Sequence, residues 1–474
     1  LRLFPVIEVG MVVTQRISRL FLLTLLLVAP NVAAKVYDPV TATLSNGLQI
    51  IVVPNHRAPV VHHMLWYRVG SVDEVEEKSG LAHYLEHLMF KGTATVPPGG
   101  YSKAIAAVGG RENAFTSHYF TAYFATVPAD FLPQLMELEA DRMHNLAITE
   151  EQAMPERDVV LAERRQRTDD EPGGRFAEKM NKAIYGTHPL GRPVIGWRDD
   201  IIGLSVEDAE DFYRQWYAPN NAILIVSGDV TPEKVLQIAA ATYGRVESQP
   251  LPLRPETRTL YVPHKEPESL FVQDPDVRQV NIQRHYIAPS YQTATGYTPY
   301  ALQVLAEILD GGAVGRLYRK LVMEKKIATE TGADYDALSR DDGSFSIGLT
   351  LPPKANVGQS ARALDALLAD LVKRGVTESE VKRAIKRMRE QAIFTRDHLM
   401  TPGYAFGQHL SLGLSVADVE NWPDTIGRVT VTEVNAAARQ VFGSKDYVTG
   451  YLIPDGKSPF AKVGKVTVPQ GDIR

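Results

Sequence analysis

Two histidines and a glutamate lie within five residues of this chain, in the segment His83-Tyr84-Leu85-Glu86-His87. On an α-helix, positions i, i+3 and i+4 share one face. Both imidazoles can therefore bind one metal ion while the Glu86 carboxylate lies close to any water on that ion. This arrangement is typical of zinc-dependent hydrolysis. The segment predicts a zinc site that includes its own general base.

The alternative is that these histidines are ordinary surface or core residues, because a five-residue pattern arises by chance in long chains. The flanking residues favour the metal site. Apolar side chains recur there at helical spacing and form the stripe of an amphipathic helix, namely Leu81, Leu85, Leu88 and Met89. We therefore expect the motif on a helix near residues 80–91 that is anchored in a core.

A catalytic zinc site has three protein ligands and one open position, so a third ligand must come from elsewhere in the chain. Residues 149–167 are typical of a second helix, with Thr149 and Gln152 spaced as a capping box. Glu156 and Glu163 are seven positions apart on it and face the same way. By themselves, these residues also fit an exposed charged helix with i,i+4 ion pairs.

The combined pattern resembles the pitrilysin family of zinc peptidases, which includes insulin-degrading enzyme and the mitochondrial processing peptidase. The order His-x-x-Glu-His is the inverzincin signature, and a glutamate 76 positions after the second histidine is in the family's register. The resemblance, in particular to the β subunit of the processing peptidase, implies that His83, His87 and Glu163 bind one Zn²⁺ per chain. It implies that Glu86 is the catalytic base and that Glu156 orients a ligand histidine.

Residues 109–123 resemble the family's Gly-Gly and Asn-Ala-x-Thr segment, an edge strand to which substrate adds as a further strand. The resemblance implies that Asn113, Ala114 and Phe115 contact the substrate. Side chains of high strand propensity alternate here, which predicts a strand over 113–126. An exposed edge binds peptides through main-chain hydrogen bonds. The alternative is an ordinary strand within a sheet.

The second half of the chain departs from the family. Members that act alone carry an Arg and a Tyr there, which orient the substrate carbonyl. Met323 and Thr329 occupy the corresponding positions here, although a shifted alignment would bring Arg319 or Tyr335 into register. The resemblance then implies a heterodimer in which this chain carries zinc and a homologous subunit carries the Arg/Tyr pair, with a self-dimer as the other form.

The predicted function is a zinc-dependent endopeptidase that hydrolyses short or unfolded peptides. The main alternative is a non-hydrolytic peptide-binding or scaffold subunit of the same fold, but such subunits usually have a broken motif. A metal-carrying protein without peptidase activity is a third possibility. Two further histidine sites, His62-His63 on an apolar strand and His188 before a proline, are interpreted as structural.

Composition bounds the class of protein. The chain has 474 residues, of which 44% are hydrophobic and 23% are charged, enough for two or more domains. A net charge of −5 argues against nucleic acid as a partner. The chain has no cysteine, which excludes disulfides and thiol catalysis.

Residues 1–34 have the pattern of a secretory signal peptide. Met11 is the expected start, Arg16 and Arg19 precede an apolar run over 20–29, and cleavage is expected near Ala34. Ten apolar residues are too few to span a bilayer, which needs about 20. The prediction is an exported periplasmic protein without a membrane span after cleavage.

The pattern of elements predicts an α+β protein made of two homologous α/β units, each a sheet packed with helices. Helices near 80–91, 129–146, 150–167 and 206–217 are interspersed with strands at 59–69 and 113–126, and Asn46-Gly47 predicts a hairpin. A Pro- and Arg-rich linker over 248–263 would separate a zinc-binding domain, 35–247, from a domain without the motif, 264–474.

An internal repeat supports this division. The segment that begins at Ser205 can be aligned with the one that begins at Thr430, 225 positions later. Each segment has the pattern of a capped helix followed by a strand. Duplication followed by loss of the metal motif from the second half accounts for the pattern.

Overall fold

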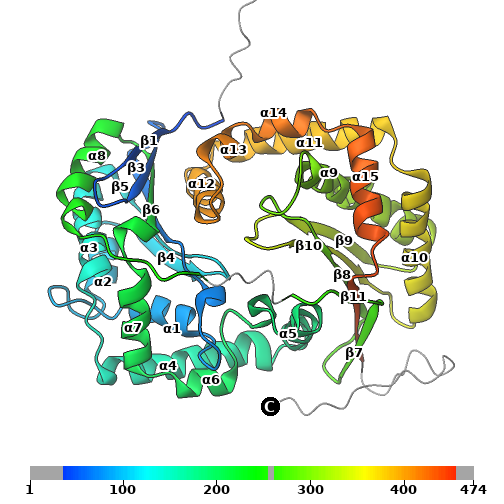
Figure 1. Ribbon diagram of the computed structural model, residues 1–474, viewed down its shortest axis with the longest axis horizontal. Helices are drawn as coiled ribbons and strands as arrows, with labels where there is room; N and C mark the ends of the chain where they lie inside the picture. Colours follow the sequence, from blue (N-terminus) through cyan, green and yellow to red (C-terminus); the bar gives the residue numbers. More distant parts are fainter. Residues whose placement is uncertain (1–35, 255–260, 455–474) are drawn as a thin grey trace, which may run out of the picture. The chain divides into compact units, whose positions relative to one another are not determined.

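The computed structural model describes residues 36–254 and 261–454, which form two sheets packed with helices (Figure 1). This confirms the predicted α+β class. The predicted signal peptide lies outside the described residues. The domain boundaries stay a prediction, and residues 255–260 of the predicted linker are also outside the description.

The first sheet has six strands in the order β1-β2-β6-β3-β5-β4. Gly47 has a φ of +88° in the predicted turn, and the strands on either side of it pair antiparallel. The β2 and β6 strands pair parallel, while the other neighbours are antiparallel. The strands are β1 (Val40–Thr43), β2 (Gln49–Pro54), β3 (Val60–Tyr67), β4 (Arg111–Thr116), β5 (Thr121–Pro128) and β6 (Ala222–Gly228).

Helices of the first half bury their apolar stripes in one core with this sheet. They are α1 (Leu81–Leu88), α2 (Gly100–Ala107), α3 (Leu132–His144), α4 (Glu150–Arg164), α6 (Arg198–Gly203), α7 (Val206–Trp216) and α8 (Pro232–Ala241). Short 3₁₀ turns are η1 (Ser71–Asp73), η2 (Ala129–Phe131), η4 (Pro189–Gly191), η5 (Pro219–Asn221) and η6 (Tyr243–Arg245), and η3 (Arg165–Asp169) is a π-helix.

The second sheet has five strands in the order β7-β11-β8-β10-β9, and burial alternates along β8 and β10 as the pleat requires. The strands are β7 (Glu268–Asp274), β8 (Asn281–Ala288), β9 (Glu330–Asp336), β10 (Gly343–Thr350) and β11 (Tyr447–Pro454). The remaining elements of this half are α9 (Thr298–Asp310), η8 (Gly312–Val314), the π-helix η9 (Tyr318–Glu324), α10 (Val357–Arg374), α11 (Glu378–Arg396), α13 (Val416–Glu420), α14 (Trp422–Gly427) and α15 (Val431–Phe442).

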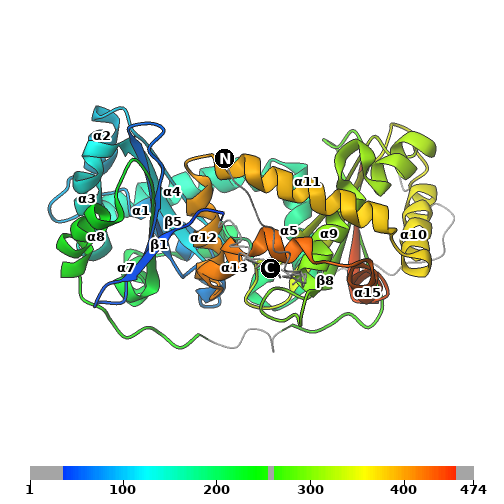
Figure 2. The ribbon, with the colours of Figure 1, turned by 90° about the horizontal axis from the view of Figure 1, so that it is seen from above.

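Each half also contributes a helix to the sheet of the other half (Figures 1 and 2). The α5 helix (Pro172–Tyr185) packs on β11 and β7, and α12 (Thr401–Ser411) packs on β6 and β3. Close approach requires glycine, because a Cβ on Gly407 would lie 2.0 Å from Trp66, and one on Gly450 would lie 2.2 Å from Met180. The two units are therefore joined by packed cores as well as by the chain.

The internal repeat is confirmed in its register. Ser205 caps α7 and Thr430 caps α15, each through a capping box. The strands that follow begin at Ala222 and Tyr447, which are again 225 positions apart.

The prediction of one strand over 113–126 is wrong. The chain forms a hairpin there, with β4 ending at Thr116 and β5 beginning at Thr121. The intervening turn is fixed by tertiary contacts, because Ser71 and Val72 donate their backbone N–H groups to the carbonyls of Ser117 and His118. The position of β4 at the edge of the first sheet is as predicted.

No helix in residues 36–254 and 261–454 combines the length and the hydropathy that a bilayer span requires.

Candidate metal centre

The α1 helix positions the His-x-x-Glu-His motif. Its N-cap, Gly80, has a φ of +89°, and a Cβ there would lie 2.5 Å from the carbonyl oxygen of Ile195. Glycine has no side chain to cap the helix, so the buried carboxylate of Glu74 does this instead. Its oxygens accept the N–H groups of Ala82 at 2.9 Å and Gly80 at 3.1 Å. These contacts fix the first turn of α1 at Gly80 and Ala82, six and four residues before Glu86.

The structure brings His83 and His87 of α1 to Glu163 of α4. The Nε2 atoms of His83 and His87 lie 3.7 Å and 3.3 Å from Oε2 of Glu163, and one ligand atom from each residue lies within 4.8 Å of the others. Two imidazole nitrogens and a carboxylate oxygen are a ligand set that suits Zn²⁺. Within the described part of the chain, this is the one group of three or more potential metal ligands.

Further charged side chains contact two of these three candidate ligands, His87 and Glu163. Nδ1 of His87 donates to Oε1 of Glu156 at 2.9 Å, and Lys91 pairs with the other oxygen of Glu156. Arg167 lies 2.6 Å from Oε1 of Glu163. His83 differs, because its buried Nδ1 has no hydrogen-bond partner among the described residues.

The two histidines titrate in opposite directions. Burial lowers the pKa of His83 to about 4, so this imidazole is neutral at pH 7, as a metal ligand must be. Burial also disfavours the charged form of His87, but the hydrogen bonds to Glu156 and Glu163 outweigh it and raise the pKa to about 9. Without a metal, His87 thus carries a positive charge between two carboxylates. These residues fit a divalent cation, which would supply that charge instead.

Glu86 faces the edge strand. Its Oε2 accepts a hydrogen bond of 2.6 Å from the hydroxyl of Thr116, the last residue of β4. Burial raises the pKa of Glu86, and the bond from Thr116 opposes this shift. A carboxylate of raised pKa that is held at one oxygen can accept and return a proton at the other.

The predicted substrate-binding residues lie on β4 with different surroundings. Asn113 is exposed, and its side chain accepts the N–H of Ala114 at 2.9 Å. The ring of Phe115 stacks on that of Tyr404 from α12, with centroids 5.7 Å apart. Phe115 is thus partly buried against a helix of the second half.

The three histidines that the sequence analysis interprets as structural have partners away from the metal centre. His62 and His63 are buried in β3, where they bond to the hydroxyls of Thr126 and Tyr243, each at 2.9 Å. Burial lowers the pKa of both to about 4. His188 accepts the N–H of Leu190 at 3.1 Å.

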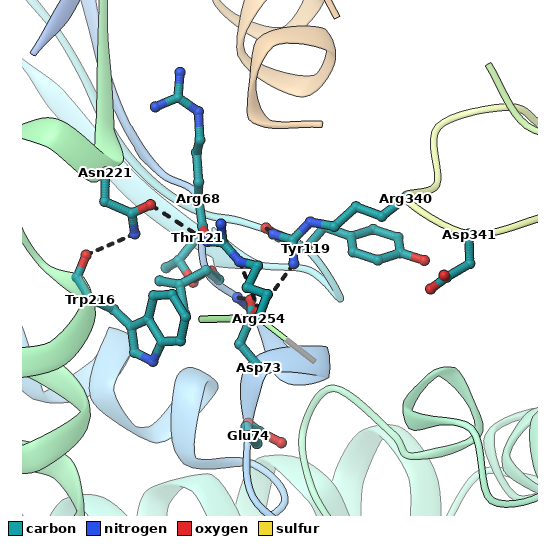
Figure 3. Close-up of polar contacts among 12 residues, drawn as sticks. Arg68, Asp73, Glu74, Tyr119, Thr121, Trp216, Asn221, Arg254, Arg340 and Asp341 are labelled. Atoms are coloured by element: carbon teal, nitrogen blue, oxygen red, sulfur yellow. Dashed lines mark hydrogen bonds and ion pairs between the residues drawn. The ribbon is translucent and has the colours of Figure 1, made fainter. Parts of the chain in front are cut away.

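Asp73, Arg254 and Arg340 form a cluster of ion pairs, here called the clasp (Figure 3). Asp73 ends η1, directly before the segment that leads into α1. Oδ1 of Asp73 accepts Nε–H of Arg254 at 3.1 Å and Nη1–H of Arg340 at 3.0 Å. Arg340, from the β9–β10 loop, also donates to the carbonyl of Tyr119 at 2.9 Å. The second half of the chain thus touches both the approach to α1 and the β4–β5 turn.

Sequence reasoning did not assign roles to Glu74, Lys91, Thr116 and Arg167. The spacing of Glu163 and Arg167 is an i,i+4 ion-pair signal that could have found that contact. Thr116 was recognised only as part of a segment, because its bond to Glu86 depends on how β4 meets α1. No local sequence pattern indicates the role of Glu74, since the N–H groups that it accepts lie six and eight residues later, across a loop.

Comparisons with known proteins identify a peptidase family and relatives that are named zinc proteases. Residues 49–197 match the family model described as Insulinase (Peptidase family M16), and residues 203–388 match the one described as Peptidase M16 inactive domain. The chain is 30% identical to the zinc protease PqqE of Helicobacter pylori over 72% of this chain and 77% of that protein. It is 29% identical to an uncharacterized zinc protease of Mycobacterium tuberculosis over 90% of this chain and 96% of that protein. The crystal structure of a protease from Helicobacter pylori matches with a TM-score of 0.82 and 27% identity, covering 88% of this chain and 99% of that one.

Proposed function

Because the chain belongs to the pitrilysin family of peptidases, family M16, we propose that it is a zinc-dependent endopeptidase of short or unfolded peptides. The observation that carries this proposal is the convergence of His83, His87 and Glu163 beside Glu86. These three residues would hold the zinc ion. When bound, zinc would polarise the peptide carbonyl and activate a water molecule for attack.

Glu86 would transfer the proton of the attacking water to the leaving group. Its Oε2 is occupied by Thr116, so Oε1 would accept the proton of the attacking water and pass it to the nitrogen of the leaving amine. Glu156 would keep His87 oriented by holding its Nδ1 at 2.9 Å. The main-chain groups of Asn113, Ala114 and Phe115 on the edge strand would bind the substrate in extended form.

The second half supports the need for a partner. Met323 has an aliphatic side chain that is 59% exposed, and Thr329 donates its hydroxyl to the carbonyl of Thr350 at 3.2 Å. Tyr335 is buried and bonds to the carbonyl of Pro289, so its hydroxyl is not free for substrate. The chain would therefore work with a homologous subunit that supplies an Arg/Tyr pair, or as a self-dimer. The lack of an available Arg/Tyr pair also fits the second candidate function, a subunit that holds peptides without hydrolysing them.

Export to the periplasm is part of this proposal. It is supported by the charged and apolar pattern of residues 11–34 in the sequence.

The deciding experiment measures hydrolysis of quenched, unstructured peptides by the zinc-loaded chain, alone and with a homologous Arg/Tyr subunit. Glu86→Gln is the matched control because it keeps the size and hydrogen bonding of the side chain. We expect the variant to bind zinc and to lose activity by at least about 100-fold. An active Glu86→Gln enzyme would refute the assignment of the base, and hydrolysis in neither mixture would favour the peptide-holding subunit.

A further inference from the structure

Arg167 is the most exposed cation beside the candidate metal centre. Its Nη1 lies 2.6 Å from Oε1 of Glu163, and its side chain is 74% exposed. Lys91, the other cation of the centre, is 30% exposed and pairs with Glu156. Nearby Arg164 is buried and pairs with Glu178. Arg167 therefore combines contact with a candidate metal ligand and N–H donors that face solvent.

The local backbone directs Arg167 to this place. The α4 helix ends at Arg164, and the chain continues as a π-helix over Arg165–Asp169. Wider turns of this kind occur frequently at functional sites. Glu163 is the one carboxylate within ion-pair distance of Arg167 in residues 36–254 and 261–454. A guanidinium has five donors, so most of them remain for a ligand.

The contact with Glu163 places the guanidinium of Arg167 beside the candidate ligand atoms of His83, His87 and Glu163, which lie within 4.8 Å of one another. An extended peptide rises about 3.3 Å per residue, so a residue one or two positions from the cleaved bond can reach it.

We infer that Arg167 gives this peptidase a preference for substrates with a carboxylate within about two residues of the cleaved bond. The inference rests on the proposed function. Arginine binds carboxylates with two parallel N–H donors, which favours them over neutral amides. The carboxylate can be an Asp or Glu side chain or the free C-terminus of a short peptide, and both sources offer the same two oxygens.

Binding tests the inference without relying on hydrolysis. Zinc-loaded Glu86→Gln protein is titrated with fluorescent peptides that differ only by Glu or Gln at one position near the centre. A second pair differs only by a free or an amidated C-terminus, which separates the two sources. We expect the acidic member of at least one pair to bind about three- to tenfold more tightly at low salt, and the difference to shrink as salt screens the charges.

Three variants in the same background locate the effect. Arg167→Gln is expected to remove the acidic preference and Arg167→Glu to reverse it. The matched control is Arg165→Gln, which removes an exposed arginine two positions away, on another face of the helix; it is expected to keep the preference. Zinc content is measured for each variant, because Arg167 also contacts Glu163.

Equal binding of acidic and neutral peptides by the Glu86→Gln protein would overturn the inference. A preference that survives Arg167→Gln would do the same, as would a loss of zinc with an equal loss of all peptides, since Arg167 would then serve Glu163 alone. Failure of the proposed function has a different signature, because the parent chain would then hydrolyse no peptide, either alone or with a homologous Arg/Tyr subunit, whatever the ratio of the binding affinities.

Discussion

The hydroxyl of Thr116 donates a hydrogen bond of 2.6 Å to Oε2 of Glu86. Thr116 ends the edge strand β4, and Glu86 lies within α1 between the two histidines of the motif. The bond therefore joins the strand proposed to hold the substrate to the residue proposed to move the proton. It leaves one oxygen of Glu86 free, and it fixes the direction in which that oxygen points.

Replacing Thr116 by valine removes this bond and keeps the shape of the side chain. We expect kcat to fall about tenfold, because the Glu86 carboxylate can then rotate away from its working position, while bound zinc is unchanged. Thr116→Ser should recover most of the activity. Steady-state hydrolysis of a quenched peptide gives kcat and KM separately. Thr126→Val is the control, since Thr126 bonds to His62 away from the centre; an equal loss there would contradict the prediction.

Glu156→Gln tests the support of His87. The carboxylate accepts Nδ1–H of His87 at 2.9 Å and pairs with Lys91. A neutral amide orients the imidazole less strongly, so we expect the affinity for zinc to fall about 10- to 100-fold. Competition with a chromophoric chelator measures the dissociation constant. Glu151→Gln alters an exposed carboxylate in the first turn of the same helix and should change nothing. An unaltered affinity in Glu156→Gln would show that the contact with His87 does not support metal binding.

Asp73→Asn tests the clasp between the two halves. The Asp73 side chain is 3% exposed and is shared by Arg254 and Arg340, which are 31% and 22% exposed. The variant leaves two guanidinium groups without their anion, so we expect the free energy of unfolding to fall by about 1–3 kcal/mol. Urea denaturation measures this change. Asp397→Asn is the control; it breaks an exposed pair with Arg57, and its loss of stability should be clearly smaller because exposed ion pairs contribute little.

A double-mutant cycle makes the test of the clasp specific. If Asp73 acts through Arg340, the losses in Asp73→Asn and Arg340→Gln should sum to more than the loss in the double variant. Additive losses would mean that the two side chains stabilise the protein independently.

Much of the fold could be predicted because its signals are local. Apolar spacing indicates α1, the capping boxes indicate α4, α7 and α15, and Asn46-Gly47 indicates the first hairpin. The β4–β5 turn was missed because residues 117–120 contain neither glycine nor proline. That turn is held from a distance, and a Cβ on Gly70 would lie 2.3 Å from the carbonyl oxygen of Ser117. Long-range packing of this kind leaves no trace in the turn's own sequence.

In the candidate site, too, the local features could be predicted from the sequence and the long-range contacts could not. Spacings of three, four and seven along a helix follow from 3.6 residues per turn, so the motif residues and the pair Glu156 and Glu163 could be placed on common faces. Contacts between elements could not be predicted. Thr116 reaches Glu86 through the pairing of a strand, and Arg340 reaches Asp73 from 267 positions away. Such contacts join residues that are far apart in the chain, so the local spacing of polar residues does not indicate them.

The cap of α1 predicts a pH dependence of stability. Burial raises the pKa of Glu74 to about 8 from an ordinary value of 4.5, although the N–H groups of Ala82 and Gly80 oppose the shift. Between these two values the folded state holds a proton that the unfolded state lacks. The free energy of unfolding should therefore fall as pH rises from 4.5 to 8, by up to about 1.4 kcal/mol per pH unit. Glu74→Gln cannot titrate, so urea unfolding at a series of pH values should give it a shallower slope than the parent. Equal slopes would mean that the Glu74 carboxylate is ionised in the folded protein throughout this range, held so by the two N–H groups at the start of the helix.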